Sequence, residues 1–105
     1  MLQDIQVILQ SFKADLKVAL GSKIGDIILF GSYSRGDFSE HSDVDLLILA
    51  KEALNPEESR IIDDLIAHYS LKYDTVISGL VYPADIFQKF NTPFLLNIKE
   101  EGVLI

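Results

Sequence analysis

The chain has 105 residues, which predicts a single domain spanning 1–105, and it contains no cysteine, which excludes disulfides and thiolate metal sites. Sixteen acidic residues outweigh nine basic ones, and the formal net charge of −7 at pH 7 argues against direct nucleic-acid binding without a partner. No apolar run approaches the roughly 20 residues of a membrane span, and we expect a cytoplasmic protein because a chain without cysteine suits a reducing compartment.

The first half of the chain predicts a helix followed by two buried strands. Residues 2–20 place apolar side chains at helical spacing, and Gly21 follows as a helix-ending residue. Residues 26–30 (DIILF) and 43–50 (DVDLLILA) are short apolar runs, which is the pattern of strands that lie within a sheet.

The second half predicts another helix, a third strand and two further helices. The string NPEE, from Asn55, combines a cap, a proline at the first helical position and a glutamate three residues after the cap. Residues 74–82 (DTVISGLVY) form the third strand, residues 83–90 a short helix, and Thr92 with the following proline opens the last helix. This order predicts an α+β fold with α/β-like alternation, in which helices pack on a small mixed sheet of three or more strands.

Two aspartates stand at the front of the second strand. Asp43 and Asp45 are two residues apart, so on a strand their side chains point to the same face, about 6.6–7 Å apart along the backbone. Carboxylates placed in this way can converge on a hard cation such as magnesium, which keeps waters or substrate phosphates in its other positions. The alternative is that both aspartates lie in a solvated loop before the strand.

A Gly-Ser pair at the end of the preceding strand favours the metal interpretation. Gly31 allows a sharp turn and a close backbone approach to a ligand, and Ser32 adds a hydroxyl and an N–H that can bind an anion. Arg35, one turn further, could reach a phosphate, or it could form a surface ion pair with Asp37 or Glu40. One strand end would then bind phosphate and the next would bind metal, as the handling of a nucleoside triphosphate with magnesium requires.

The string GSYSRGDFSEHSDVDLLIL resembles the signature of the minimal nucleotidyltransferase branch of the DNA polymerase β-like superfamily, in which GS, RG and SD-x-DLL recur at these spacings. The NPEE-opened helix and the ending NIKEEGVLI are similar to that branch too, so the resemblance covers essentially the whole chain. It implies the nucleotidyltransferase fold.

The resemblance also assigns roles to residues. Gly31 and Ser32 would hold the triphosphate, and Asp43 and Asp45 would bind two Mg²⁺ ions. The superfamily takes a third carboxylate from the next core strand, where Asp74 is the best match as a third metal ligand and catalytic group. Asp63 and Asp64 are its rivals, but they follow the NPEE cap on a helix. His41 is expected to be an exposed loop residue.

The function that the resemblance implies is transfer of AMP from ATP to an acceptor. Members of this branch are typically encoded beside a helical HEPN-type partner, often a ribonuclease toxin, and act as antitoxins, in some cases by adding AMP to the partner. The acidic charge and the 49% of apolar residues suit such a partner, although the apolar residues could equally form an ordinary dense core. Two alternatives stay open: an antitoxin that acts by binding alone, and a nucleotidyltransferase acting on tRNA ends or a small molecule.

Overall fold

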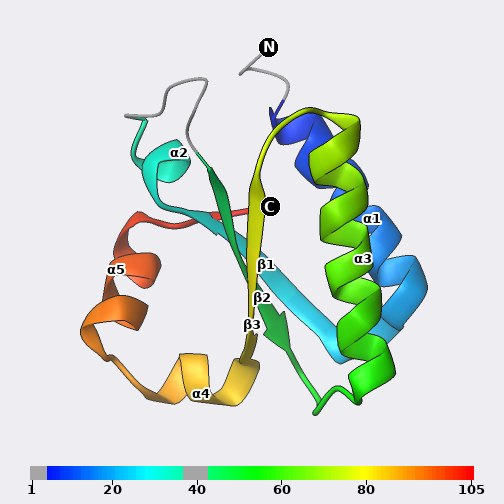
Figure 1. Ribbon diagram of the computed structural model, residues 1–105. Coiled ribbons are helices and arrows are strands. Elements are labelled where there is room, and N and C mark those ends of the chain that lie inside the picture. The colour runs from blue at the N-terminus through cyan, green and yellow to red at the C-terminus, as the bar shows by residue number, and fades with distance from the viewer. Residues whose placement is uncertain (1–4, 37–42) are drawn as a thin grey trace.

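The computed structural model describes residues 5–36 and 43–105, in which helices cover both faces of one sheet (Figure 1). In chain order the elements are α1 (Ile5–Leu20), the short 3₁₀ helix η2 (Gly21–Lys23), β1 (Ile24–Phe30), α2 (Ser32–Arg35), β2 (Val44–Ala50), α3 (Pro56–Lys72), β3 (Ile77–Pro83), α4 (Ala84–Lys89), α5 (Pro93–Glu101) and β4 (Val103–Leu104). The predicted α+β fold with a mixed sheet and packed helices is therefore confirmed. Residues 2–4 of the predicted first helix lie outside the described residues.

The sheet has the strand order β3-β2-β1-β4. The central strands β1 and β2 are antiparallel, as are β1 and β4, whereas β2 and β3 are parallel. A parallel pair needs a crossover connection, and α3 provides it between β2 and β3. The two-residue strand β4 was not predicted, since nothing in so short a segment distinguishes it from a loop.

The two faces of the sheet carry different layers (Figure 1). Helices α1 and α3 cover one face over the larger core, whose fully buried members include Phe12, Leu46 and Ile48. The short helices α4 and α5 lie on the other face over a smaller cluster formed by Ile28, Leu47, Leu49 and Ile98. Because both faces are covered, β2 is apolar along almost its whole length, and only Asp45 interrupts it.

Helix α1 is joined to α3 by a polar and an aromatic contact. The Tyr69 hydroxyl donates a hydrogen bond to the Asp15 carboxylate at 2.5 Å, and the Tyr69 ring meets the Phe12 ring edge-on with centroids 5.5 Å apart. Burial and the neighbouring carboxylate raise the pKa of Tyr69 to about 12, so this hydroxyl keeps its proton.

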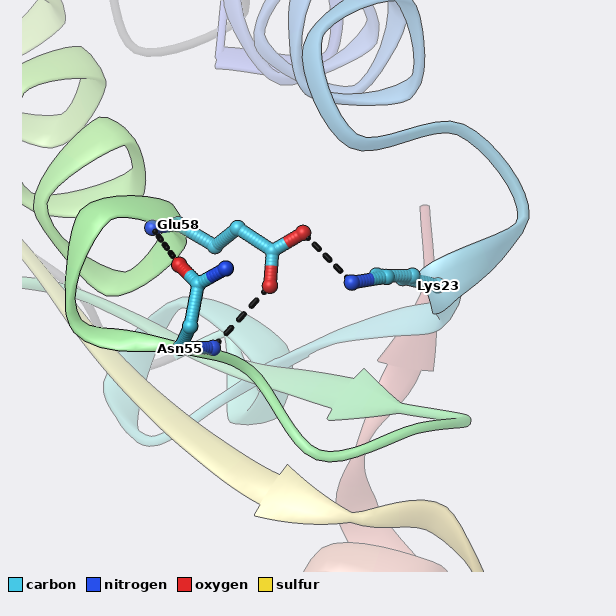
Figure 2. A network of polar contacts seen from close by, with 3 residues as sticks. All are labelled: Lys23, Asn55 and Glu58. Atoms are coloured by element: carbon cyan, nitrogen blue, oxygen red, sulfur yellow. Dashed lines mark hydrogen bonds and ion pairs between the residues drawn. The ribbon is translucent and has the colours of Figure 1, made fainter.

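The predicted cap of α3 is present and is tied to η2 (Figure 2). The Asn55 side chain accepts from the Glu58 N–H at 2.8 Å, and the Asn55 N–H donates back to the Glu58 carboxylate at 3.0 Å. The second oxygen of that carboxylate lies 2.6 Å from the Lys23 ammonium. The Glu58 carboxylate therefore accepts a hydrogen bond from the backbone at the start of α3 and also holds Lys23 of η2 in place.

In the part of the chain that the structure describes, no helix has the combination of length and apolar character needed to span a bilayer.

Replacing Glu58 with glutamine should lower the melting temperature at neutral pH, and the deficit should shrink as the pH falls. The Lys23 ammonium, and then the Asn55 N–H, hold the pKa of Glu58 below its ordinary value of 4.5. The ionised group therefore contributes its full stability above pH 4.5 and loses it as the pH falls through the lower folded pKa. Thermal unfolding of both proteins across this range is the measurement.

The matched control is Glu57→Gln, because Glu57 lies in the same first turn of α3 but is exposed. It should unfold close to the wild-type temperature at every pH. A Glu58→Gln deficit that stays constant with pH would contradict the electrostatic explanation.

Candidate active site

The site lies where β1 ends and β2 begins. These strands are antiparallel, and their register pairs Phe30, the last residue of β1, with Asp45 near the start of β2. Asp45 faces the α5 side of the sheet, because the next residues of the same parity, Leu47 and Leu49, belong to the cluster under α4 and α5. The antiparallel pairing thus brings the Gly-Ser pair to the aspartates.

Gly31 has a backbone conformation that only glycine adopts readily. Its φ of 79° and ψ of −153° fall in a region closed to residues with a Cβ atom. A Cβ built there would also collide with the Asp45 carboxylate, so the backbone at Gly31 and the Asp45 side chain are in close contact. Gly31 and Asp45, which the sequence assigned to one site, are therefore adjacent in space.

Helix α2 begins at Ser32 directly after this turn. The backbone amides of Ser34 and Arg35 donate to the Gly31 carbonyl at 3.1 and 3.2 Å, and the Ser34 hydroxyl donates to it at 2.9 Å. These bonds hold Ser32 at the strand end. Gly36 closes the helix in the left-handed conformation.

Arg35 contributes positive charge to the site. Its guanidinium lies 4.0 Å from the Glu101 carboxylate at the end of α5, and its charge acts on Asp45. The other ion-pair partners considered for it, Asp37 and Glu40, lie outside the described residues, as does His41.

The Asp45 carboxyl is in an unfavourable electrostatic environment. Burial, and then the negative charge of Asp43, raise the pKa of Asp45 above its ordinary value, while Arg35 offsets part of that rise. Asp43 is exposed just before β2. Two adjacent carboxylates, one of them partly buried, form a place where a cation would be stabilised.

A pocket of about 250 Å³ adjoins the glycine turn. Phe30, Gly31 and Arg35 line one side of it, and Phe94, Asn97 and Glu101 of α5 line the other. The Phe30 and Phe94 rings meet edge-on with centroids 5.8 Å apart. The pocket therefore combines aromatic surface, a side-chain amide and a guanidinium beside the strand ends.

Asp74 does not occupy the position predicted for it. Strand β3 begins at Ile77, and Asp74 lies in the preceding turn with φ 50°. Its N–H bonds the Leu71 carbonyl and the Thr75 N–H bonds the Ser70 carbonyl, which is the Schellman pattern that ends a helix. Asp tolerates the left-handed conformation that this pattern requires, so Asp74 terminates α3.

Within residues 5–36 and 43–105, no group of three or more His, Cys, Asp and Glu side chains is placed to hold a metal. The structure therefore brings Asp43 and Asp45 together without Asp74. The residue of β3 that pairs with Asp45 is Ser78, which the sequence interpretation did not single out. Its alternation with Ile77 and Gly79 on the strand is the only sequence signal for it, and that signal does not fix the register.

Comparison with known sequences identifies the domain. The family model described as "Nucleotidyltransferase domain" matches residues 6–105. A Methanocaldococcus jannaschii protein named putative protein adenylyltransferase MJ0141 is 42% identical over 95% of this chain and 97% of its own length. A second protein of that organism, putative protein adenylyltransferase MJ0604, is 38% identical over 90% of each chain.

Solved structures share the fold. A crystal structure described as a toxin–antitoxin with AMP-PNP aligns with a TM-score of 0.62 at 21% identity, over 90% of this chain and 70% of the other. A Shewanella oneidensis structure, described as a tri-AMPylated HEPN toxin in complex with MNT antitoxin, aligns with a TM-score of 0.60 at 19% identity, over 94% and 69%.

Replacing Gly31 with alanine should disrupt both the fold and the site. The backbone conformation alone costs about 1–3 kcal/mol for a residue with a Cβ atom, and the collision displaces the Asp45 carboxylate. Urea unfolding should show the loss of stability. Nucleotidyl transfer should fall below detection even at temperatures where the variant is folded.

The control is Gly21→Ala, because Gly21 also has positive φ but a Cβ there meets nothing within 4 Å. It should lose about 1–2 kcal/mol and keep its activity. Similar activity in the two variants would show that the contact between Gly31 and Asp45 does not matter.

Proposed function

This chain belongs to the nucleotidyltransferase domain family, and we propose that it transfers AMP from ATP, with magnesium, to a HEPN-type helical partner protein in a toxin–antitoxin pair. The observation that carries the proposal is the contact between Gly31 and the Asp45 carboxylate where β1 meets β2. This contact places a backbone turn suited to binding phosphate next to the two carboxylates that would bind the metal.

The phosphate end of the nucleotide would bind at the turn. Gly31 presents no side chain, so the phosphates can approach the backbone, and Ser32 donates from its hydroxyl and its N–H. Arg35, close enough to affect the Asp45 pKa, would neutralise phosphate charge. The adjoining pocket would take the nucleoside, with Phe94 as an aromatic surface and Asn97 as a hydrogen-bonding group.

Asp43 and Asp45 would hold the magnesium. Mg²⁺ in nucleotide sites is bound by one or two carboxylates together with substrate phosphates, and these two side chains are such a donor set. When bound, it would neutralise phosphate charge and stabilise the in-line displacement of pyrophosphate by an acceptor hydroxyl. The chain itself holds Asp45 on β2, whose other residues are buried, and Asp43 directly precedes that strand.

Three observations support the HEPN-type partner. Structures with this fold include a HEPN toxin in complex with an MNT antitoxin. The net charge of −7 favours a cationic partner. Exposed apolar residues on and before the edge strand β3 offer contact surface: Leu71 is 84% exposed, Val76 57% and Leu80 43%.

A second candidate is an antitoxin that neutralises its partner by contact alone. The observation that favours it is the lack of a third metal-binding carboxylate within the described residues. Neutralisation by contact needs the surface of the protein but not its chemistry.

The decisive experiment is intact-mass spectrometry of this chain and its genomically adjacent partner after incubation with ATP and Mg²⁺. We expect AMP-sized increments on the partner. Asp43→Asn and Asp45→Asn should abolish them, because each removes one of the two carboxylates. Unmodified partner with the wild-type chain, together with protection of cells by Asp45→Asn, would establish neutralisation by contact instead.

The Asp45→Asn chain should also be at least as stable as the wild type when metal is chelated. Burial and the neighbouring Asp43 disfavour the ionised carboxylate, and asparagine removes that charge while keeping the shape. Thermal unfolding in EDTA is the measurement. A lower melting temperature would mean that the carboxylate serves the fold, and lost transfer could then not be assigned to chemistry.

A further inference from the structure

We propose that Ser78, rather than Asp74, supplies the β3 side chain of the metal site, so that the protein's donors there are two carboxylates and one hydroxyl. This inference rests on the proposed function, because it concerns the same site. It is carried by the register of the sheet.

Ser78 is the neighbour of Asp45 across the parallel pair. The register is regular from Val44↔Ile77 to Ala50↔Pro83, and it sets Asp45 beside Ser78. Adjacent strands lie about 4.8 Å apart, so no position on β3 is nearer to Asp45 than this one.

Ser78 also points to the correct face. Ile77 packs in the core under α1 and α3, whereas Tyr82 packs against the cluster under α4 and α5. Side chains alternate along a strand, so Ser78 shares the face of Tyr82, which is the face of Asp45. Ser78 is exposed, and its hydroxyl is accessible to a bound ion.

Asp74 is held away by its role in ending α3. It lies three residues before β3, on a turn whose two backbone hydrogen bonds fix its left-handed conformation. On the neighbouring strand, Asp43 is level with Val76, since the Val44 N–H bonds the Val76 carbonyl and Val44 pairs with Ile77. Asp74 is therefore two residues short of the aspartate pair along β3.

A hydroxyl in place of a third carboxylate makes the site less negative, but all its protein donors are still oxygen atoms. Serine and threonine hydroxyls bind Mg²⁺ in nucleotide sites, so Ser78 can complete an oxygen donor set. The protein then contributes two negative charges in place of three. The affinity for a divalent cation without nucleotide should be correspondingly low, because carboxylate count sets much of that affinity.

Mn²⁺ binding, followed by electron paramagnetic resonance of the free ion, tests this without reference to activity. Ser78→Asp should tighten Mn²⁺ binding at least about tenfold by adding a third carboxylate. Ser78→Ala should weaken it about threefold to tenfold, the size of one neutral polar contact. Asp74→Asn, which suits the same turn, should bind Mn²⁺ like the wild type.

Gln10→Glu controls for net charge, because Gln10 is exposed on α1 and this change alters the charge as Ser78→Asp does. It should leave Mn²⁺ binding unchanged. Circular dichroism establishes that each variant is folded.

Two results would overturn the inference: weaker binding in Asp74→Asn with no change in either Ser78 variant, or equal tightening by Gln10→Glu and Ser78→Asp. Failure of the proposed function would look different. If Asp43→Asn and Asp45→Asn bound Mn²⁺ as tightly as the wild type, the metal site would not lie at these aspartates at all.

Discussion

The antiparallel pairing of β1 with β2 is the constraint on which the site depends. It places the end of one strand against the start of the next, and the register sets Phe30 beside Asp45. The residue that follows β1 must then be glycine, because a Cβ at position 31 would occupy the space of the Asp45 carboxylate. The position of α2, the approach of Arg35 and the pocket against α5 all follow from that turn.

Most of the buried apolar contacts lie on the face of the sheet opposite the site. The larger core, the contact of Tyr69 with Asp15 and the capping network of Glu58 belong to α1, η2 and α3. The site faces the thinner layer of α4 and α5, where the buried cluster is small. A partly buried carboxylate with a raised pKa is tolerated there because the rest of β2 is embedded in apolar contacts.

Local chemistry made much of this structure predictable from sequence. The NPEE cap, the order of the first three strands and the adjacency of Gly31 to Asp45 depend on residues near one another in the chain, or on a short antiparallel connection. The predicted place of Asp74 on the third strand was wrong, because an aspartate before an apolar run also suits the left-handed residue that ends a helix. Ser78 could not be found, because the register of a parallel pair joined by α3 is set by packing and has no local signal.

The composition of the proposed site suggests that metal binding would depend on the nucleotide. Burial, and then the charge of Asp43, raise the pKa of Asp45. Two carboxylates would hold a cation less strongly than three would. In the proposed function the remaining negative oxygens would come from the triphosphate, which the Gly31 turn and Arg35 would hold beside the carboxylates. Metal and nucleotide would accordingly bind with positive coupling, since each supplies charge that the other lacks. With Ser78 as the donor from β3, more of the proposed metal site would come from the substrate than from the protein.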